Sequence, residues 1–271
     1  MLTDGRESTI RRRPVPSAGA AYPVHTHLLV GADDQTGLEG GRYVVDTATG
    51  RLFRRPGTAR GADGGSQIVF TVAPGRTFAR YRHRAWPLWI ADTAYAVAAV
   101  EFLLGTAVRL HVGPSRELRD SLAVPLASNT RWWLDRGLAP EIPLAAVELP
   151  AGWRIRTERA RVLSVRRSAA LPEFQRNRST CPAASSLATL SRQEWVSGAD
   201  RVLTWTVTLG EPDALLEHLW RVHRDAASTL YRSCLTGRWW CRPVSGIPAR
   251  GDVWTVHALA MLRARSERNG S

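Results

Sequence analysis

The feature that most constrains the fold is a long apolar segment, residues 88–104, which we expect to form a helix with apolar side chains on most of its surface. A surface helix carries one apolar stripe, whereas a helix that is apolar all round has to be buried on every side. We therefore expect a central helix enclosed by other elements or lying in a subunit interface. Its most apolar part, residues 94–105, is interrupted by Glu101 and is too short for us to expect a membrane span.

Alternating apolar and polar residues predict strands on both sides of this helix. A turn at residues 47–50 predicts a hairpin, and Glu211, Pro212 and Asp213 mark the start of an amphipathic helix up to Leu235. Pro150, Ala151 and Gly152 mark a boundary, so we expect one unit over residues 1–150 and another over 151–271. The expected strands are residues 23–30, 41–46, 51–53, 67–72, 107–112, 145–149 and 201–209.

The length of 271 residues, with 44% hydrophobic and 23% charged residues, fits one large α/β unit or two small fused ones. The N-terminus has no charged-then-apolar signal pattern, so we expect a cytoplasmic protein. Three cysteines without a Cys-x-x-Cys pair argue against a disulfide scaffold and against a four-thiolate metal site.

All 37 basic residues are arginine, and the net charge is +13. The absence of lysine excludes Schiff-base catalysis, an internal pyridoxal phosphate aldimine and a P-loop. Arginine is suited to bidentate contacts with carboxylates and phosphates, so nucleic acid, a phosphate-bearing cofactor and an acidic peptide all remain open as partners. The alternative is a merely solvated basic surface.

Residues 13–23 carry a motif of small residues flanked by proline, in which Pro14 and Pro16 prevent a regular helix and Gly19 allows a close approach of the backbone. The segment resembles the R-x-x-P-S-A-G-A-L-Y-P pattern of the nitroreductase-fold azoline dehydrogenases of ribosomal peptide biosynthesis, the streptolysin type. The resemblance continues in order over residues 11–150, through Gly41-x-Tyr43-x-x-Asp46, residues 76–81, Arg84, the apolar helix and residues 144–149. The motif residues are Arg13, Pro16, Ser17, Ala18, Gly19, Ala20, Tyr22 and Pro23.

The resemblance implies an FMN cofactor at a dimer interface. Small residues let the backbone approach the flat flavin ring, and backbone amides and the Ser17 hydroxyl can bond to its polar edge. We expect Ser17, Ala18, Gly19, Ala20 and Tyr22 to bind the cofactor. The alternative is an ordinary tight turn that enters a strand.

The family holds the FMN phosphate with an N-terminal Arg-Arg-Ser motif, which is missing ahead of residue 11. Arg166, Arg167 and Ser168 resemble it, and two guanidinium groups with a hydroxyl at a helix start suit a phosphate. The chain would then be a shortened tandem of two nitroreductase-like halves, or a rearranged one in which residues 151–271 complete the first half. The alternative is that both arginines are surface charges.

The family's catalytic pair is Lys-Tyr, and the matching positions are Arg80 and Tyr81. Tyr81 can transfer a proton if its pKa is lowered, which Arg80 would do by favouring the phenolate. Arginine cannot itself take the proton, because its pKa exceeds about 12. The family's Gly-His in the helix is also replaced, by Ala94-Tyr95.

Other patterns favour packing over chemistry. His218 and His223 do not share a helix face, and His25 and His27 share a strand face without a further ligand, so we expect no metal site. Tryptophan pairs at residues 132–133 and 239–240 suit core packing or aromatic walls for a peptide or flavin. We do not expect nucleic-acid binding, since no motif of a known module is present.

We therefore predict an α+β nitroreductase-like fold, with helices around an antiparallel-rich sheet, as a homodimer or paired with a homologous subunit. The implied function is FMN-dependent oxidation of thiazoline or oxazoline rings to azoles in a ribosomally made peptide whose acidic leader docks on the basic surface. One alternative is a flavin-free relative that catalyses another step on a modified peptide or binds it. Another is a generic nitroreductase or ene-reductase.

Overall fold

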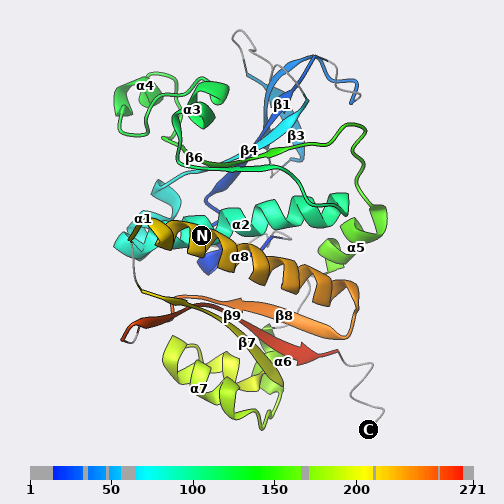
Figure 1. Cartoon of the computed structure of the whole chain (residues 1–271), viewed down its shortest axis with the longest axis vertical. Helices are drawn as coiled ribbons and strands as arrows, with labels where there is room; N and C mark the ends of the chain where they lie inside the picture. Colours follow the sequence, from blue (N-terminus) through cyan, green and yellow to red (C-terminus); the bar gives the residue numbers. More distant parts are fainter. Residues whose placement is uncertain are drawn as a thin grey trace, which may run out of the picture.

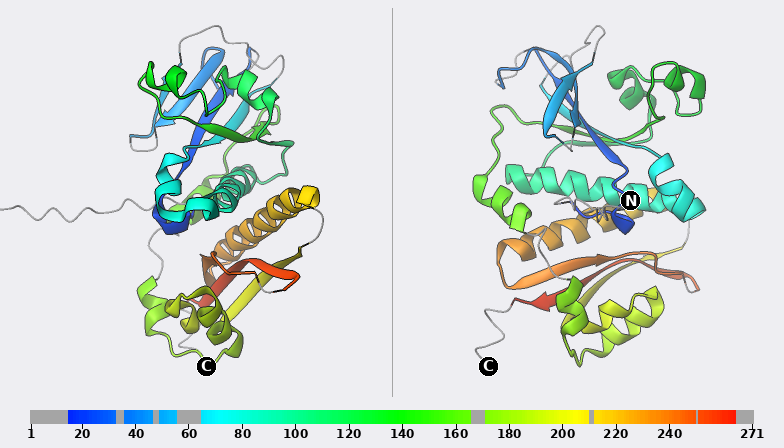
Figure 2. Two further views of the ribbon diagram at one scale, coloured as in Figure 1. Left: turned by 90° about the vertical axis from the view of Figure 1, so that its left-hand side faces the viewer. Right: turned by 180° about the vertical axis from the view of Figure 1, so that it is seen from behind.

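The computed structural model shows a layered molecule, in which a six-stranded sheet, two long helices, a three-stranded sheet and short helices follow one another (Figure 1). Two further views show the same order of layers (Figure 2). The structure describes residues 15–32, 36–46, 49–55, 65–165, 171–209, 212–249 and 251–264.

The first sheet is antiparallel throughout, with the strand order β3-β2-β1-β4-β6-β5. The antiparallel pairing of β2 with β3 confirms the hairpin that was predicted, while β6 begins three residues earlier than expected and β5 is shorter. The strands are β1 Val24–Val30, β2 Gly41–Asp46, β3 Arg51–Arg54, β4 Gln67–Val72, β5 Leu110–Val112 and β6 Ile142–Glu148.

The two faces of this sheet are covered differently, because side chains alternate along each strand. Phe70 and Val72 pack with the long helices. Val69 and Leu29 point the other way and pack with Trp133 of α4 (Thr130–Leu134) and with α3 (Arg116–Leu122). Both faces of the centre of the sheet are therefore buried.

The predicted apolar helix is α2, Ala85–Leu104. It ends at Gly105, whose φ of 77° is left-handed and whose N–H donates to the Glu101 carbonyl. By length and composition α2 could cross a membrane, but 72% of its most apolar window is buried within the protein, as expected of a central helix that other elements enclose. It lies beside α8, Pro212–Leu235, as Figure 1 shows.

The second sheet has the order β7-β9-β8 and packs against α8. Its strand β7, Arg201–Thr208, matches the prediction, but β8, Trp239–Val244, and β9, Val253–Arg263, were not predicted. The short helices α6, Leu171–Arg176, and α7, Pro182–Ser191, cover its outer face (Figure 1).

The chain passes from the first sheet to α5, Thr157–Val165, through the segment predicted as a boundary. The parts on either side share one core, since Val97 of α2 packs in the same cluster as Leu219 and Trp220 of α8. Whether residues 151–271 form a shortened second nitroreductase-like half or complete the first one stays a prediction.

Candidate functional site

The small-residue motif forms a tight loop between Ser17 and Tyr22, immediately before β1. The 3₁₀ turn η1, Ala18–Ala20, closes it with bonds from the Ala20 amide to the Ser17 carbonyl and from the Ala21 amide to the Ala18 carbonyl. Gly19, Ala20 and Tyr22 have φ values of 58°, 55° and 47°. Alanine and tyrosine rarely adopt this left-handed region, so the loop is strained and has to be held in place.

Asp92 of α2 holds the loop, and the sequence analysis did not single it out. Its Oδ2 accepts from the Ser17 hydroxyl at 2.6 Å and its Oδ1 from the Ala18 amide at 3.3 Å, while Ser17 Oγ accepts from the Tyr22 amide at 2.9 Å. Burial raises the pKa of Asp92 to about 7, against the opposing effect of the bonds from Ser17 and Ala18. The sequence does contain one indication of its role, because an acidic residue in a helix predicted to be buried and apolar is unusual and needs a partner.

The predicted catalytic pair lies directly over this loop. Arg80 and Tyr81 end α1, Gly75–Tyr81, and Arg80 Nη1 is 3.5 Å from the Gly19 carbonyl. A Cβ placed on Gly19 would lie 2.2 Å from Tyr81 Oη and 3.0 Å from Arg80 Nη1. A side chain at position 19 would displace the ends of Tyr81 and Arg80, and the contact of Arg80 with Gly19 brings together residues that are 61 positions apart in the sequence.

Four exposed arginines lie along α1 and along the turn η2, Arg82–Arg84, which follows it. Arg76 Nη1 donates to the Tyr22 carbonyl at 3.1 Å, and Arg80 lies with its Cζ 5.5 Å from the Tyr81 ring centre. Within the described residues, Arg76, Arg80, Arg82 and Arg84 form no ion pair with a carboxylate. The surface beside the loop thus carries uncompensated positive charge, which attracts anions.

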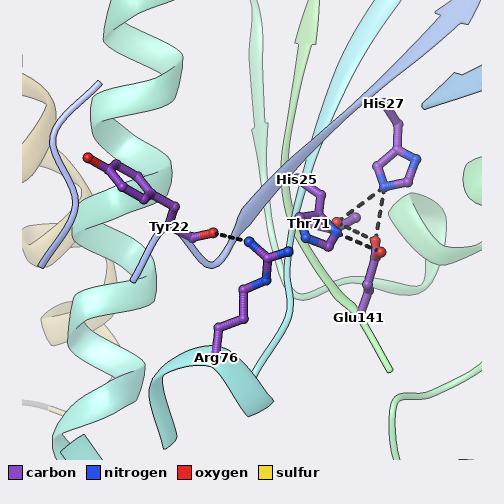
Figure 3. A network of polar contacts seen from close by, with 6 residues as sticks. All are labelled: Tyr22, His25, His27, Thr71, Arg76 and Glu141. Atoms are coloured by element: carbon purple, nitrogen blue, oxygen red, sulfur yellow. Dashed lines mark hydrogen bonds and ion pairs between the residues drawn. The ribbon is translucent and has the colours of Figure 1, made fainter. Parts of the chain in front are cut away.

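A second polar cluster occupies the sheet face opposite α2, near the same end of β1 (Figure 3). Glu141 bridges the two histidines, with Oε1 2.8 Å from His25 Nδ1 and Oε2 2.9 Å from His27 Nε2, and Thr71 also donates to Oε2. Burial raises the pKa of Glu141, but the bonds from His25, His27 and Thr71 outweigh it and hold that pKa well below the usual range.

This cluster adds a third polar partner that the sequence analysis did not find. Each histidine bonds to a different oxygen of Glu141, so the carboxylate links the two rings instead of converging with them on one point. In the described part of the chain, no group of three or more His, Cys, Asp or Glu side chains is arranged to hold a metal ion.

The remaining predicted residues divide into two groups. Arg166, Arg167 and Ser168, the predicted phosphate cradle, lie outside the described residues. Tyr95, which stands where the family has histidine, bonds through its hydroxyl to His257 Nε2 at 2.8 Å, and the His257 ring packs on His223. Burial lowers the pKa of both histidines, to about 4 for His223.

The tryptophan pairs have mixed roles. Trp133 is buried in the core, while Trp132 stacks under Arg136 with the guanidinium carbon 4.4 Å from the ring centre. Trp239 carries Arg263 over its ring at 5.7 Å, and Trp240 packs with the core under α6 and α7. Among the described residues, the ring–ring and cation–π contacts of these tryptophans involve no residue of the Ser17–Tyr22 loop.

No family model and no curated protein matches this sequence. Among solved structures, a candidate nitroreductase from Anabaena variabilis superposes with a TM-score of 0.65 and 13% identity, over 94% of this chain and 83% of that one. This chain has a nitroreductase-like fold. The E. coli microcin synthetase complex McbBCD, with truncated pro-MccB17 bound, matches with a TM-score of 0.35 and 18% identity over 51% of this chain and 55% of that one, which is too weak to add to the assignment.

Within this nitroreductase-like fold, the loop offers a surface that suits a flat anionic cofactor. Gly19 is exposed, and Ala18 and Ala20 are small and half-buried. The amides of Ala18, Ala20, Ala21 and Tyr22 donate within the protein, whereas that of Gly19 has no acceptor among the described residues. Together with the arginines, these features fit a flavin that rests on the loop and bonds to one amide.

Proposed function

We propose that this protein is an FMN-dependent oxidoreductase that converts azoline rings of a ribosomally made peptide into azoles. The observation that carries the proposal is the packing of Arg80 and Tyr81 over Gly19 in the small-residue loop. It joins the two parts of the sequence that resemble the azoline dehydrogenases, the flavin motif and the catalytic pair. The nitroreductase-like fold supports it.

Oxidation of an azoline removes one proton and one hydride from adjacent ring atoms. FMN, when bound, supplies the hydride acceptor. We assign the proton to the oxygen of Tyr81 in its phenolate form, which becomes the neutral phenol when it takes the proton. Tyr81 is half-buried beside the loop, and Arg80 cannot accept the proton, since a guanidinium stays protonated. Arg80 lies beside the Tyr81 ring, where a cation favours the phenolate form that accepts the proton.

The uncompensated arginines supply the binding energy in this proposal. Arg76, Arg80, Arg82 and Arg84 are placed to attract an acidic peptide leader, and we assign the cofactor phosphate to Arg166, Arg167 and Ser168. Individual exposed pairs contribute only about 0–1 kcal/mol, so several have to act together. The partner is thus a peptide with an acidic segment, bound by a homodimer or with a homologous subunit.

The absorption spectrum of the purified protein and the Tyr81→Phe variant test this function. We expect a bound oxidised flavin, and in Tyr81→Phe an unchanged flavin content with turnover roughly a hundredfold lower, because only the proton-transferring hydroxyl is removed. Turnover is followed by mass spectrometry as loss of two hydrogens from an azoline peptide. Full activity of Tyr81→Phe would remove the tyrosine from the mechanism.

A second candidate function is a flavin-free subunit that binds the modified peptide. It is favoured by the Ser17 hydroxyl, which is engaged by Asp92 and the Tyr22 amide, and by the replacement of the family's lysine with Arg80. A colourless protein that takes up no added FMN yet binds an acidic peptide would support this alternative over the first.

A further inference from the structure

Asp92 is a buried acid in the middle of the most apolar helix of the protein. Its side chain lies among buried neighbours on α2, where Ile90, Ala91, Thr93 and Ala94 are also inaccessible to solvent. Ionising a carboxyl in such surroundings is costly, which is why burial raises its pKa. An apolar residue would pack here without that cost, so the carboxyl needs a reason to be present.

The bonds of Asp92 supply that reason. Both oxygens reach out of the helix to the Ser17–Tyr22 loop, at 2.6 Å to the Ser17 hydroxyl and 3.3 Å to the Ala18 amide. Ser17 links Asp92 to the far end of the loop, since its Oγ also accepts a hydrogen bond from the Tyr22 amide at 2.9 Å. One carboxylate on a rigid helix thus fixes the first and last residues of the loop.

The loop would not keep its shape without such an anchor. Ala20 and Tyr22 both have left-handed φ values, which are unfavourable for residues with a side chain. Gly19, which precedes Ala20, has to stay within contact of Tyr81 Oη and Arg80 Nη1. A relaxed loop would withdraw Gly19 from the pair that the proposed function makes catalytic.

We propose that Asp92 is a positioning residue that, through Ser17, holds the loop in its strained form and so sets the flavin surface at Gly19 against Arg80 and Tyr81. The role in flavin binding rests on the proposed function. The role in holding the loop does not, since it concerns only contacts within this chain.

Four variants of the whole protein test the proposal at a fixed pH. Asp92→Asn keeps the shape and removes the charge, and Ser17→Ala removes the relay hydroxyl. Ser17→Thr retains the hydroxyl and serves as the rescue. Glu101→Gln is the matched control, because Glu101 is also on α2 but pairs with Arg224 away from the loop.

Two quantities are measured for each variant: amide hydrogen exchange at Ala18 and Tyr22, and the Kd for added FMN. We expect Asp92→Asn and Ser17→Ala to speed exchange at both amides at least tenfold and to weaken FMN about tenfold. Ser17→Thr and Glu101→Gln should stay near wild type. A double variant that combines Asp92→Asn with Ser17→Ala should show less than the sum of the two single effects, because both residues share the bond from Ser17 to Asp92.

The outcomes separate the two ideas. Unchanged exchange and unchanged FMN affinity in Asp92→Asn would overturn the proposal. Faster exchange with unchanged FMN affinity would leave Asp92 as a loop anchor and overturn its role at the flavin surface. A wild-type protein that binds no FMN would refute the proposed function, while the exchange rates would still decide whether Asp92 holds the loop. Melting temperatures of all variants identify any that fail to fold.

Discussion

Two features of position 19 favour glycine: its backbone has a left-handed φ, and the ends of Tyr81 and Arg80 occupy the space where a side chain would begin. In Gly19→Ala, we expect a loss of stability clearly larger than the roughly 1 kcal/mol of backbone strain, because the new Cβ would lie 2.2 Å from Tyr81 Oη. Gly37→Ala is the control: its φ is +75° but nothing lies within 4 Å of the added Cβ. Urea unfolding of both variants measures the difference.

The same contact predicts a rescue at the residue scale. Tyr81→Phe removes the atom that meets the new Cβ, so adding it to Gly19→Ala should recover part of the lost stability. Equal losses in Gly19→Ala and Gly37→Ala, or no recovery in the double variant, would show that the tyrosine does not rest on the loop.

Asp92 also predicts a pH dependence of stability. Its pKa rises from 3.8 to about 7 on folding, so between these values the folded protein holds a proton that the unfolded chain has lost. This group's contribution to stability is therefore fully present below about pH 4 and is lost as the pH rises through 7. His223 and His257, with lowered pKa values, act in the opposite direction between about pH 4 and 6.5 and partly mask the effect.

Comparing the unfolding free energies of the wild type and of Asp92→Asn isolates the contribution of the aspartate, because His223 and His257 are present in both proteins. We expect the unfolding free energy of wild type minus that of the variant to fall as the pH rises from 4.5 to 7.5, by at most about 1.4 kcal/mol per pH unit. Urea titrations at four pH values measure it. A constant difference would mean that Asp92 is ionised throughout.

At the scale of elements, the contact of α2 with α8 joins the two sheets into one core. Leu219 of α8 is fully buried in the cluster that also contains Phe70 of the first sheet and Val256 of the second. We expect Leu219→Ala to lower stability by about 2–5 kcal/mol, and Leu216→Ala, which is largely exposed on the same helix, to cost far less.

The shared core also predicts how the protein unfolds. Both sheets should unfold in one transition, followed by tryptophan fluorescence and by circular dichroism, and Leu219→Ala should shift the whole curve. Two separate transitions, with only one of them moved by the substitution, would contradict a common core.

The elements that sequence reasoning found are those whose pattern is local. The apolar run predicted α2, alternation predicted β1 and β7, a short apolar run predicted β4, and the turn between two short runs predicted the hairpin of β2 and β3. The strand β9 was missed because Ala258–Leu262 is continuously apolar, which fits a buried strand and a buried helix equally well.

Of the candidate site, the loop and the Arg80–Tyr81 pair were predicted from a motif. Asp92 and Glu141 were not predicted, because their partners lie 75 and 114 residues away in the sequence and only the fold brings them together.

At the scale of the whole molecule, the net charge of +13 is unevenly compensated. In the part of the chain that the structure describes, Arg224 pairs with Glu101 and Arg176 with Glu173, whereas the four arginines beside the loop pair with no carboxylate. These four arginines place positive charge beside the candidate site, and this is the surface from which long-range steering of an anionic ligand would act.

The packing of α2 against α8 has a consequence for how the chain can be divided. The backbone joins the two parts through residues 150–156, which are mostly exposed, while the parts hold each other by two buried helices. Cleavage of the backbone at this surface segment would leave the core intact. Each fragment alone, however, would expose to water the apolar side of α2 or of α8 that the other helix now covers. Two fragments produced from a chain cut at this segment would therefore have to associate to be stable, as two obligate subunits do.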